Sequence, residues 1–467
     1  MKLLAALAAL AAAVPLPAQR AAVTEADRRM AREILEELVS FRTAKGQGQV
    51  PAMAEALATR FRAAGFPAAD IQMLPVEIDG EKTVGLVVRY AGKPGGKKPI
   101  ALLGHMDVVD ALPENWATDP FKPVEKDGYL YGRGSVDNKA QVSLISASFI
   151  RLKKAGFVPD RDLLIAFSGD EETGMRTTRL LTKHPWVSTA EYALNGDAGS
   201  GGVTPDGKTY DFNIQSAEKT TATFSVAASN PGGHSSAPRP DNAIFELADA
   251  IKKIQAHRFP VEFNVISRTM VEDIVAERRD AFGAALKTLL TDPTNAEAIA
   301  VASRYPEANV IWTTCVPTML RAGNAFNALP QNAVATVNCR IFPGTPVEAV
   351  RAKLAEVVGN PKIKVTLDNE AVESPVSPIR PDLFASITRA VHANYPGAPV
   401  KPSMSSGGTD GREFRRVGIP TYGAGSLALV RPDDGRAHGT DERVPLQAFY
   451  KELTFWDVLL RDLAGGA

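Results

Sequence analysis

The stretch that decides the fold is Ile100-Ala-Leu-Leu-Gly-His-Met-Asp107, an apolar run that ends in a histidine and a carboxylate. Similar runs at Leu163–Ser168 and Tyr192–Leu194 are also followed by glycine and acidic residues. Short continuous apolar runs of this kind indicate strands buried on both faces. The sequence therefore predicts a largely parallel sheet with polar residues at the carboxyl ends of its strands.

Helical segments alternate with these runs. Apolar residues recur at helical spacing in Glu25–Phe41, Pro51–Ala64 and Lys139–Ala155, and a further strand-like run covers Val84–Tyr90. Strands that alternate with helices are typical of an α/β fold with a mostly parallel sheet. We expect this fold class for the part of the chain that carries His105.

The pattern changes near Gln215, where Thr220–Ala228 begins to alternate like a half-exposed strand. Further helices are expected at Asn242–Ala256, Val271–Leu290, Val347–Val358, Pro381–His392 and Leu446–Leu463. The α/β pattern returns after Val376. We therefore predict one α/β domain, formed by residues 19–214 and 371–467, that is interrupted by a smaller α+β domain at residues 215–370.

The N-terminus has the pattern of a secretory signal peptide. Met1-Lys2 precedes an apolar run from Leu3 to Val14, and a small residue follows at Ala18. An alanine-rich helix is the alternative. The run is shorter than the roughly 20 residues that span a bilayer. We expect residues 1–18 to be removed and the mature protein to be periplasmic or extracellular, with no membrane span.

The charge balance excludes one class of partner. The 467 residues include 53 basic and 53 acidic side chains, and the formal net charge is zero. A neutral surface has no long-range attraction for nucleic acid or for an anionic membrane. We therefore expect neither as a partner.

Only two cysteines occur, Cys315 and Cys339. The segments that hold them, Val310–Leu320 and Asn332–Ile341, have the pattern of two strands joined by a loop. In an antiparallel hairpin this spacing sets the two cysteines opposite each other. The sequence leaves open whether they form a disulfide or stay as two buried thiols.

Two of the six histidines, His105 and His438, lie in segments rich in carboxylates. Neutral imidazole and carboxylate oxygen are the ligands of hydrolytic zinc and related ions. Several of the histidine and acidic segments directly follow a strand-like run, and the carboxyl ends of parallel strands meet at one edge of a sheet. We therefore expect one site formed by His105, Asp137, Glu171, Glu172, Asp197 and His438.

Six separated segments agree at once with one known family. They are Gly104–Val109 (GHMDVV), Gly132–Lys139 (GRGSVDNK), Gly169–Gly174 (GDEETG), Asn195–Asp197 (NGD), Pro231–Ser236 (PGGHSS) and His438–Glu442 (HGTDE). In order and spacing they resemble the M20 family of metallopeptidases over nearly the whole mature chain. The resemblance implies a zinc-peptidase domain interrupted by a lid or dimerisation domain.

The resemblance also implies two divalent metal ions, with zinc expected first and cobalt or manganese as alternatives. One ion would be held by His105 and Asp197 and the other by Glu172 and His438, with Asp137 bridging both. Two ions about 4 Å apart polarise a scissile carbonyl and lower the pKa of a shared water.

Three further residues receive roles from the resemblance. Glu171 would act as the general base and later protonate the leaving amine. Asp107 would accept the second ring proton of His105 and fix its tautomer. His234, in the inserted domain, would reach the site of a neighbouring subunit and stabilise the oxyanion. A homodimer formed through the inserted domain is expected on the same ground.

Substrate contacts are also expected from the resemblance. Arg340 would bind a terminal carboxylate, for which its planar guanidinium is suited. Asn327 and Gly408 would hold the backbone and carboxylate of the substrate, although each also fits simple turn chemistry. The helical stretch from Arg258 to Tyr305 departs from the family by its length.

Three functions are compatible with these residues. The first is a dipeptidase or carboxypeptidase acting on short peptides, and the second is a deacylase of N-acyl amino acids with the same site. The third is a binding protein without activity, which the complete set of expected ligands disfavours. A serine hydrolase is not expected, because no Gly-x-Ser-x-Gly elbow occurs where one is required.

Overall fold

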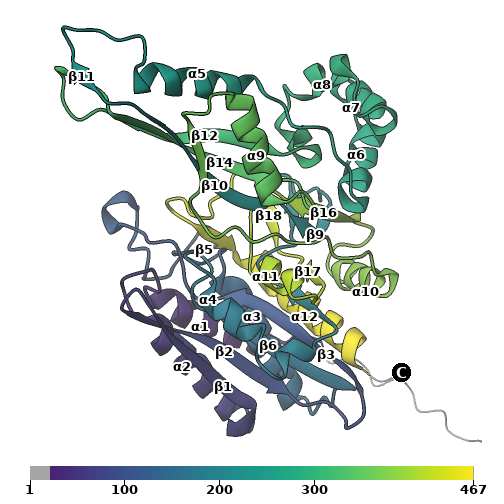
Figure 1. Ribbon diagram of the computed structural model, residues 1–467. Coiled ribbons are helices and arrows are strands. Elements are labelled where there is room, and N and C mark those ends of the chain that lie inside the picture. Colours follow the sequence, from purple (N-terminus) through teal and green to yellow (C-terminus); the bar gives the residue numbers. More distant parts are fainter. Residues whose placement is uncertain (1–21, 466–467) are drawn as a thin grey trace, which may run out of the picture.

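A six-stranded sheet forms the centre of the larger body in the computed structural model, which describes residues 22–465 (Figure 1). In sheet order its strands are β1 (Ile71–Ile78), β2 (Glu81–Tyr90), β6 (Arg161–Ser168), β3 (Lys97–His105), β7 (Tyr192–Asn195) and β17 (Thr421–Gly423). The pairs from β6 to β17 are parallel, whereas β1–β2 and β2–β6 are antiparallel. The parallel half of the sheet is the half that carries His105.

The antiparallel pair at one edge has a local cause. Asp79 and Gly80 both have positive φ, and they join β1 to β2 in a two-residue turn. An Asp-Gly pair favours this kind of hairpin. The predicted α/β class is confirmed, and the sheet is mixed.

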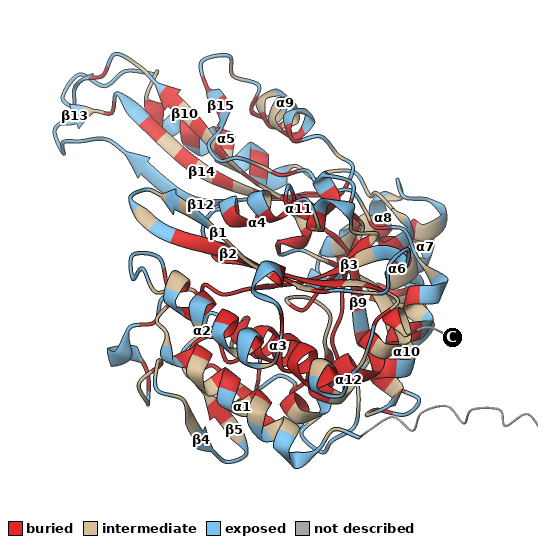
Figure 2. Cartoon of the chain, turned by 90° about the horizontal axis from the view of Figure 1, so that it is seen from below, coloured by how far each residue is buried: buried red, intermediate tan, exposed pale blue. Residues whose placement is uncertain are grey.

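Helices cover both faces of this sheet (Figure 1). One layer contains α1 (Glu25–Ser40), α2 (Val50–Ala63), α3 (Lys139–Lys154), α10 (Pro381–His392) and α12 (Leu446–Ala464), and the other contains α4 (Arg176–Leu181) and α11 (Gly411–Arg416). Alternate residues of β3 belong to two separate hydrophobic clusters, Leu102 with the first layer and Leu103 with the second. The continuous apolar run is thus explained by burial on both faces, and α3 is almost entirely buried (Figure 2).

A four-stranded antiparallel sheet forms the smaller, inserted body. Its order is β12 (Thr314–Ala322), β14 (Asn332–Ile341), β10 (Thr220–Ser229) and β15 (Lys364–Leu367). The helices α5 (Ala243–Ala256) and α9 (Val347–Val358) pack on one face. The short strands β11 (Gly233–His234) and β13 (Ala328–Leu329) pair at its far tip (Figure 1).

Cys315 and Cys339 lie opposite each other on β12 and β14 and form a disulfide. The predicted register of the two strands is therefore confirmed. Of the two states that the sequence left open, the structure has the disulfide.

The helical stretch predicted at Val271–Leu290 is wrong as a single helix. The structure has α6 (Val265–Glu277) and α7 (Ala281–Thr291), followed by α8 (Ala296–Ala302). The break occurs because Asp280 caps α7, its side chain accepting a hydrogen bond from the Gly283 amide at 3.0 Å.

The helix α6 also joins the two bodies. It packs against β16 (Val400–Ser405), which pairs in parallel with β9 (Phe212–Glu218) of the larger body. Lys401 Nζ lies 2.9 Å from Glu277 Oε1 on α6 and 2.7 Å from Asp211 Oδ2.

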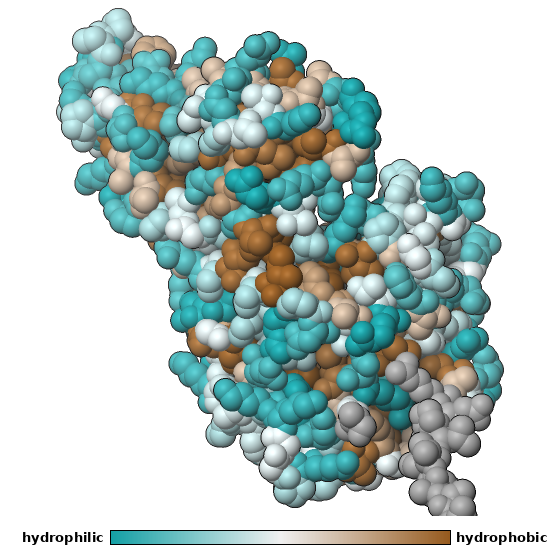
Figure 3. All heavy atoms as spheres, turned by 90° about the vertical axis from the view of Figure 1, so that its right-hand side faces the viewer, coloured by the Kyte–Doolittle hydropathy of each residue, from teal (hydrophilic) through white to brown (hydrophobic). Residues whose placement is uncertain are grey.

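Figure 3 shows hydrophobic residues gathered near the middle of a face that is otherwise largely hydrophilic.

Short elements complete the fold. They are β4 (Val124–Lys126), β5 (Tyr129–Tyr131), β8 (Gly201–Val203), β18 (Ala428–Val430), β19 (Arg443–Pro445) and the 3₁₀ helices at Ala68–Asp70, Pro113–Asn115, Val187–Thr189 and Pro306–Ile311. Among the helices of residues 22–465, none is long and apolar enough to cross a membrane. The leader predicted at residues 1–18 lies outside the described residues. The limits 215 and 370 of the inserted domain stay a prediction, and residue 215 lies within β9.

Candidate metal centre

The carboxyl ends of three neighbouring strands bring the predicted ligands together. His105 is the last residue of β3 and lies opposite Ser168, the last residue of β6. Glu171 and Glu172 follow β6, and Asp197 follows β7. Parallel strands present their carboxyl ends at one edge, so these loops meet although they are distant in the sequence.

Four carboxylates and two imidazoles converge at this edge in three overlapping groups. The groups are His105–Asp137–Asp197, Asp137–Glu172–His438 and His105–Glu171–Glu172, and within each the ligand atoms lie within 4.8 Å of one another. Asp137 belongs to the first two groups. Its Oδ1 lies 2.9 Å from His105 Nε2 and its Oδ2 lies 3.1 Å from His438 Nε2.

The remaining contacts complete the two groups that share Asp137. His105 Nε2 lies 3.5 Å from Asp197 Oδ1, and His438 Nε2 lies 2.9 Å from Glu172 Oε1. One imidazole and one private carboxylate on each side of a shared carboxylate is a donor set suited to two divalent ions. The residues of this edge therefore fit a pair of metal ions. We call it the metal edge, formed by His105, Asp137, Glu171, Glu172, Asp197 and His438.

The carboxylates at this edge stabilise positive charge on the two histidines. Hydrogen bonds to Asp137 and Glu172 raise the pKa of His438 to about 10. Burial alone lowers the pKa of His105, but the Asp197 and Asp137 carboxylates outweigh it and raise this pKa well above its usual value. Burial also raises the pKa of Asp197 to about 7 and that of Glu171 well above its usual range. Divalent cations would relieve the same excess of negative charge.

Asp107 does not make the contact predicted for it. The ring nitrogen Nδ1 of His105 lies 2.9 Å from the backbone carbonyl of Asp107, and the nearest carboxylate oxygen is 3.7 Å away. The carboxylate instead accepts the backbone amides of Glu171 and Glu172, both at 3.0 Å. Because these amides hold the carboxylate, the backbone oxygen is left to orient the histidine.

Glu442 is a buried residue next to these ligands to which the sequence analysis gave no role. Its buried carboxylate accepts the amides of Gly134, Val136 and Asp137 at 2.8–3.1 Å and lies 2.7 Å from Arg133 Nη1. It thus fixes the loop that carries the shared ligand. The only signal was its place at the end of the His438–Glu442 segment.

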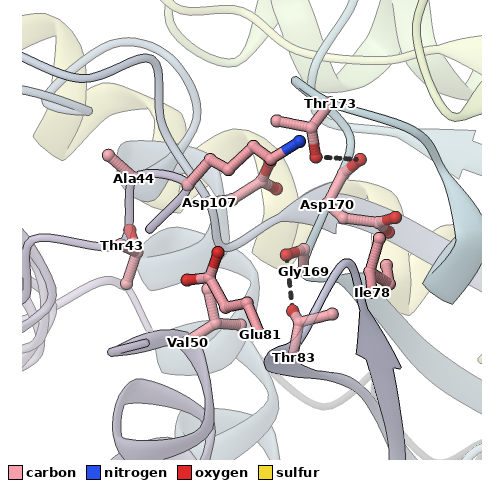
Figure 4. A pocket seen from close by; sticks show the side chains of 11 residues that line it. Thr43, Ala44, Val50, Ile78, Glu81, Thr83, Asp107, Gly169, Asp170 and Thr173 are labelled. Carbon is pink, nitrogen blue, oxygen red and sulfur yellow. Dashed lines mark hydrogen bonds between the residues drawn. The ribbon is translucent and has the colours of Figure 1, made fainter. Parts of the chain in front are cut away.

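Hydrogen bonds to the Asp170 side chain stabilise the turn that carries Glu171. Asp170 accepts the amides of Arg176 and Thr177 at 2.7 and 2.9 Å. A side chain at Gly169 would meet the Val84 carbonyl at 2.5 Å, so this position requires glycine. Figure 4 shows the cavity behind the turn, with Asp107 and Asp170 in its wall. With a volume of about 30 Å³ it has room for water but is too small for a substrate.

Two predicted substrate residues lie beside this turn. Arg340 Nη1 donates to Thr221 Oγ1 at 2.8 Å and to the Ser406 carbonyl at 3.1 Å, which places it at the loop of Gly408. A side chain at Gly408 would meet Arg412 Nη1 at 2.8 Å. Arg412, which the sequence analysis did not single out, therefore lies at the same loop.

Arg340 and Arg412 form no ion pair with a carboxylate of residues 22–465. Burial and the positive charge of Arg412 both lower the pKa of Arg340. Two uncompensated guanidinium groups beside the metal edge suit an anionic ligand.

His234 and Asn327 lie elsewhere. The Ser235 amide donates to the Asn327 carbonyl at 3.1 Å, so the two predicted residues are neighbours at the exposed tip formed by β11 and β13 (Figure 1). The structure does not bring them to the metal edge of their own chain.

A family model described as peptidase family M20/M25/M40 matches residues 101–462. The chain belongs to this family. As an M20 protein it is a hydrolase that acts on peptide or amide bonds. The resemblance inferred from the six segments is confirmed.

Individual relatives are distant. The M20 chain is 28% identical over 374 residues to the N-fatty-acyl-amino acid synthase/hydrolase PM20D1 of Xenopus tropicalis, covering 78% of this chain and 72% of that protein. It is 27% identical to a probable carboxypeptidase S-like 2 of Dictyostelium discoideum, covering 81% and 74%. The solved M20 metallo-carboxypeptidase Sso-CP2 of Sulfolobus solfataricus is 17% identical, with a TM-score of 0.69 and 92% and 98% of the chains covered. At this identity the solved structure shows the shared fold.

Proposed function

We propose that this M20 protein uses two divalent ions to hydrolyse an amide bond next to a free carboxylate. The substrate is a short peptide, cleaved as by a dipeptidase or carboxypeptidase, or an N-acyl amino acid. The observation that carries the proposal is the position of Asp137, which belongs to two ligand groups at once, with Glu171 beside them.

The ligand sets follow from these groups. His105 and Asp197 would hold one ion, Glu172 and His438 the other, and Asp137 both. Bound there, the ions supply Lewis acidity that polarises the scissile carbonyl and acidifies water. Imidazole and carboxylate suit zinc first, and cobalt or manganese as well.

Glu171 is proposed as the proton carrier. It lies with His105 and Glu172 in the third group, and burial raises its pKa well above the usual range. A carboxylate with a raised pKa accepts a proton from water more readily and can then deliver it to the leaving amine nitrogen. The hydrogen bond from its amide to Asp107 fixes the position of this residue.

Arg340 and Arg412 are proposed to bind the carboxylate of the substrate. Their uncompensated charges lie at the Gly408 loop, beside the turn of Glu171. A carboxylate bound there places the adjacent amide toward the metal edge, which supports an exopeptidase or an acyl-amino-acid hydrolase.

A homodimer through the inserted body is also proposed. β12 is an edge strand that is largely exposed (Figure 2). Its residues Val316, Met319 and Leu320 are at least half exposed. A long exposed edge is a ready template for pairing with another chain. In such a pair His234 and Asn327 at the tip would be available to the neighbouring site.

Export of the mature protein completes the proposal. The disulfide between Cys315 and Cys339 supports it, because disulfides persist in oxidising compartments. The predicted leader points the same way.

The test is release of amino acids from dipeptides and N-acyl amino acids by zinc-loaded protein, compared with Glu171→Gln. We expect the variant to lose about 10²- to 10⁴-fold in kcat, the range for a general base, while its metal content stays at two ions. Glu348→Gln, at a surface ion pair with Arg351, is the matched control and should be fully active. If the wild type binds two ions but hydrolyses no substrate of the panel, the proposed substrate class is wrong.

A further inference from the structure

A chain of buried hydrogen bonds reaches the metal edge at Asp197. The Asp197 amide donates to Asn195 Oδ1 at 3.1 Å, and Asn195 Nδ2 donates to Thr409 Oγ1 at 2.9 Å. The Thr409 hydroxyl then donates to Glu218 Oε1 at 2.7 Å. We infer that Thr409 is a positioning residue for Asp197, through which the Gly408 loop determines the affinity for one of the two ions. The inference rests on the proposed function, because it takes Asp197 to be a metal ligand.

The Thr409 hydroxyl uses its full hydrogen-bonding capacity. A hydroxyl has one proton to donate and two lone pairs that accept. The proton goes to Glu218, while the lone pairs accept Asn195 Nδ2 and the Gly411 amide, the latter at 3.1 Å. The Thr409 amide also donates to Glu218, to Oε2 at 2.9 Å. The threonine is thus fixed through both its backbone and its side chain.

Glu218 is a rigid end for this chain. Its carboxylate is fully buried, and Arg415 Nη1 lies 2.7 Å from its Oε1. Buried charges that are paired and hydrogen-bonded keep one arrangement, because any other leaves a charge without a partner. The direction of the Thr409 hydroxyl is therefore set by a group that belongs to neither ion.

Asn195 transmits this arrangement to the ligand. Its side chain is fully buried, and each end of its amide group has one partner, Asp197 for the oxygen and Thr409 for the nitrogen. Without the Thr409 oxygen the amide nitrogen would be buried and unsatisfied, which is costly. A rotation of the side chain toward another acceptor would also remove the oxygen from the Asp197 amide.

Only one of the two proposed ions depends on this support. Asp197 belongs to the group that it forms with His105 and Asp137, and it is absent from the group of Asp137, Glu172 and His438. The amide of Glu172 is held by Asp107, which is not part of the chain from Glu218. Loss of the Thr409 hydroxyl should therefore weaken one ion and leave the other.

The same loop contacts the junction with the inserted body. Lys219 lies between β9 and β10, and its amide donates to the Ser405 carbonyl at 2.9 Å. Arg340 donates to the next carbonyl, that of Ser406, at 3.1 Å. The loop that supports Asp197 is thus the loop at which the substrate carboxylate is proposed to bind. Such a loop orients the substrate and one ion relative to each other.

The experiment is calorimetric titration of the metal-free protein with zinc, in the wild type and in Thr409→Val. Valine has the shape of threonine but lacks the hydroxyl, so Asn195 loses its acceptor. We expect the ion held by His105 and Asp197 to bind about 10- to 100-fold more weakly, while the affinity for the other ion is unchanged. Asp197→Asn and Glu172→Gln identify the two binding steps, because each removes charge from one of the two ligand sets.

Two further variants separate the hydroxyl from general packing. Thr409→Ser keeps the hydroxyl and loses a methyl group, and it should bind both ions as the wild type does. Thr291→Val is the matched control, because the Thr291 hydroxyl bonds only to the Thr288 carbonyl on the exposed face of α7. It too should bind both ions normally. Thr409→Ser keeps the test valid if the valine variant does not fold, since weaker zinc binding in the serine variant would overturn the inference.

The remaining outcomes distinguish this inference from the proposed function. Equal weakening of both ions in Thr409→Val, or unchanged affinity for both, would overturn the inference alone, provided that the wild type binds two ions. A wild type that binds fewer than two zinc ions would overturn the proposed function, and the role of Thr409 with it.

Discussion

The metal edge and the inserted sheet hold their polar groups in different ways. At the metal edge each important side chain has several partners, as Glu442 does with three amides and Arg133. On the inserted body, His234 and Asn327 lie exposed at a tip and β12 is a free edge. Groups that must keep a fixed geometry are thus built into the larger body, whereas groups suited to meeting another molecule are on the smaller one.

Removing Glu442 should cause the largest loss at the metal edge. Glu442→Ala leaves the Asp137 loop without its amide acceptor and Arg133, only 3% exposed, without a counterion. We expect metal affinity to fall about 10- to 100-fold and the free energy of unfolding to fall by about 3–5 kcal/mol. Calorimetric zinc titration and denaturant unfolding measure these effects. Glu348→Ala at the surface should alter neither, and unchanged zinc affinity in Glu442→Ala would show that the loop keeps its shape without this carboxylate.

Removing the disulfide should affect only the inserted body. The bond joins residues 24 apart in sequence, and a loop of that length corresponds to about 3 kcal/mol of stabilisation. The double variant Cys315→Ser, Cys339→Ser should lose this amount, with faster hydrogen exchange in β12 and β14. Zinc affinity should stay as in the wild type, which tests whether the two bodies are independent. If the double variant also loses zinc binding, the two bodies are not independent.

A buried lysine at the junction of the two bodies should give the smallest effect. Burial, helped by the positive charge of Arg340, lowers the pKa of Lys219 to about 8, and its Nζ donates to the Trp312 carbonyl at 2.6 Å. Between pH 8 and 10.5 the unfolded chain therefore binds more protons at this residue than the folded chain. The contribution of Lys219 to stability should rise by about 1.5 kcal/mol from pH 8 to 9.5.

The measurement is denaturant unfolding of wild type and Lys219→Met across that pH range. The rise should be present in the wild type and missing in the variant, while Lys364→Met on β15 should behave like the wild type. Parallel pH curves for wild type and Lys219→Met would refute the assignment of this effect to the junction.

The sequence predicted β2, β3, β6 and β7 and the helices α1, α2, α3, α10 and α12 of the larger body, but not β1, β17, α4 or α11. It placed His105, Glu171, Glu172 and Asp197 together because each follows a short apolar run, and such runs mark strand ends without knowledge of long-range contacts. Asp137 and His438 do not directly follow such a run. Helix α9 and helix α10 were predicted with their observed limits. The opposition of Cys315 and Cys339 followed from hairpin symmetry alone.

Two of the misses concern contacts that no local sequence pattern specifies. Glu442 contacts Asp137 across 305 positions of sequence, and no local pattern specifies that contact. The Asp107 carboxylate makes no hydrogen bond to His105, because the nearby amides of Glu171 and Glu172 hold it, and the sequence does not specify such a side-chain direction. The break between α6 and α7 did have a local signal, the capping residue Asp280, which was hidden by apolar spacing that continues on both sides.

One carboxylate, that of Asp107, carries the amides of both Glu171 and Glu172. The backbone of a proposed proton carrier and that of a proposed metal ligand are therefore held by the same side chain. An ion of different radius that displaced Glu172 would therefore also shift the amide of Glu171 through the shared carboxylate. Exchange of the metal ion would then change the position of the proposed base, while the residues proposed to contact the substrate stay the same.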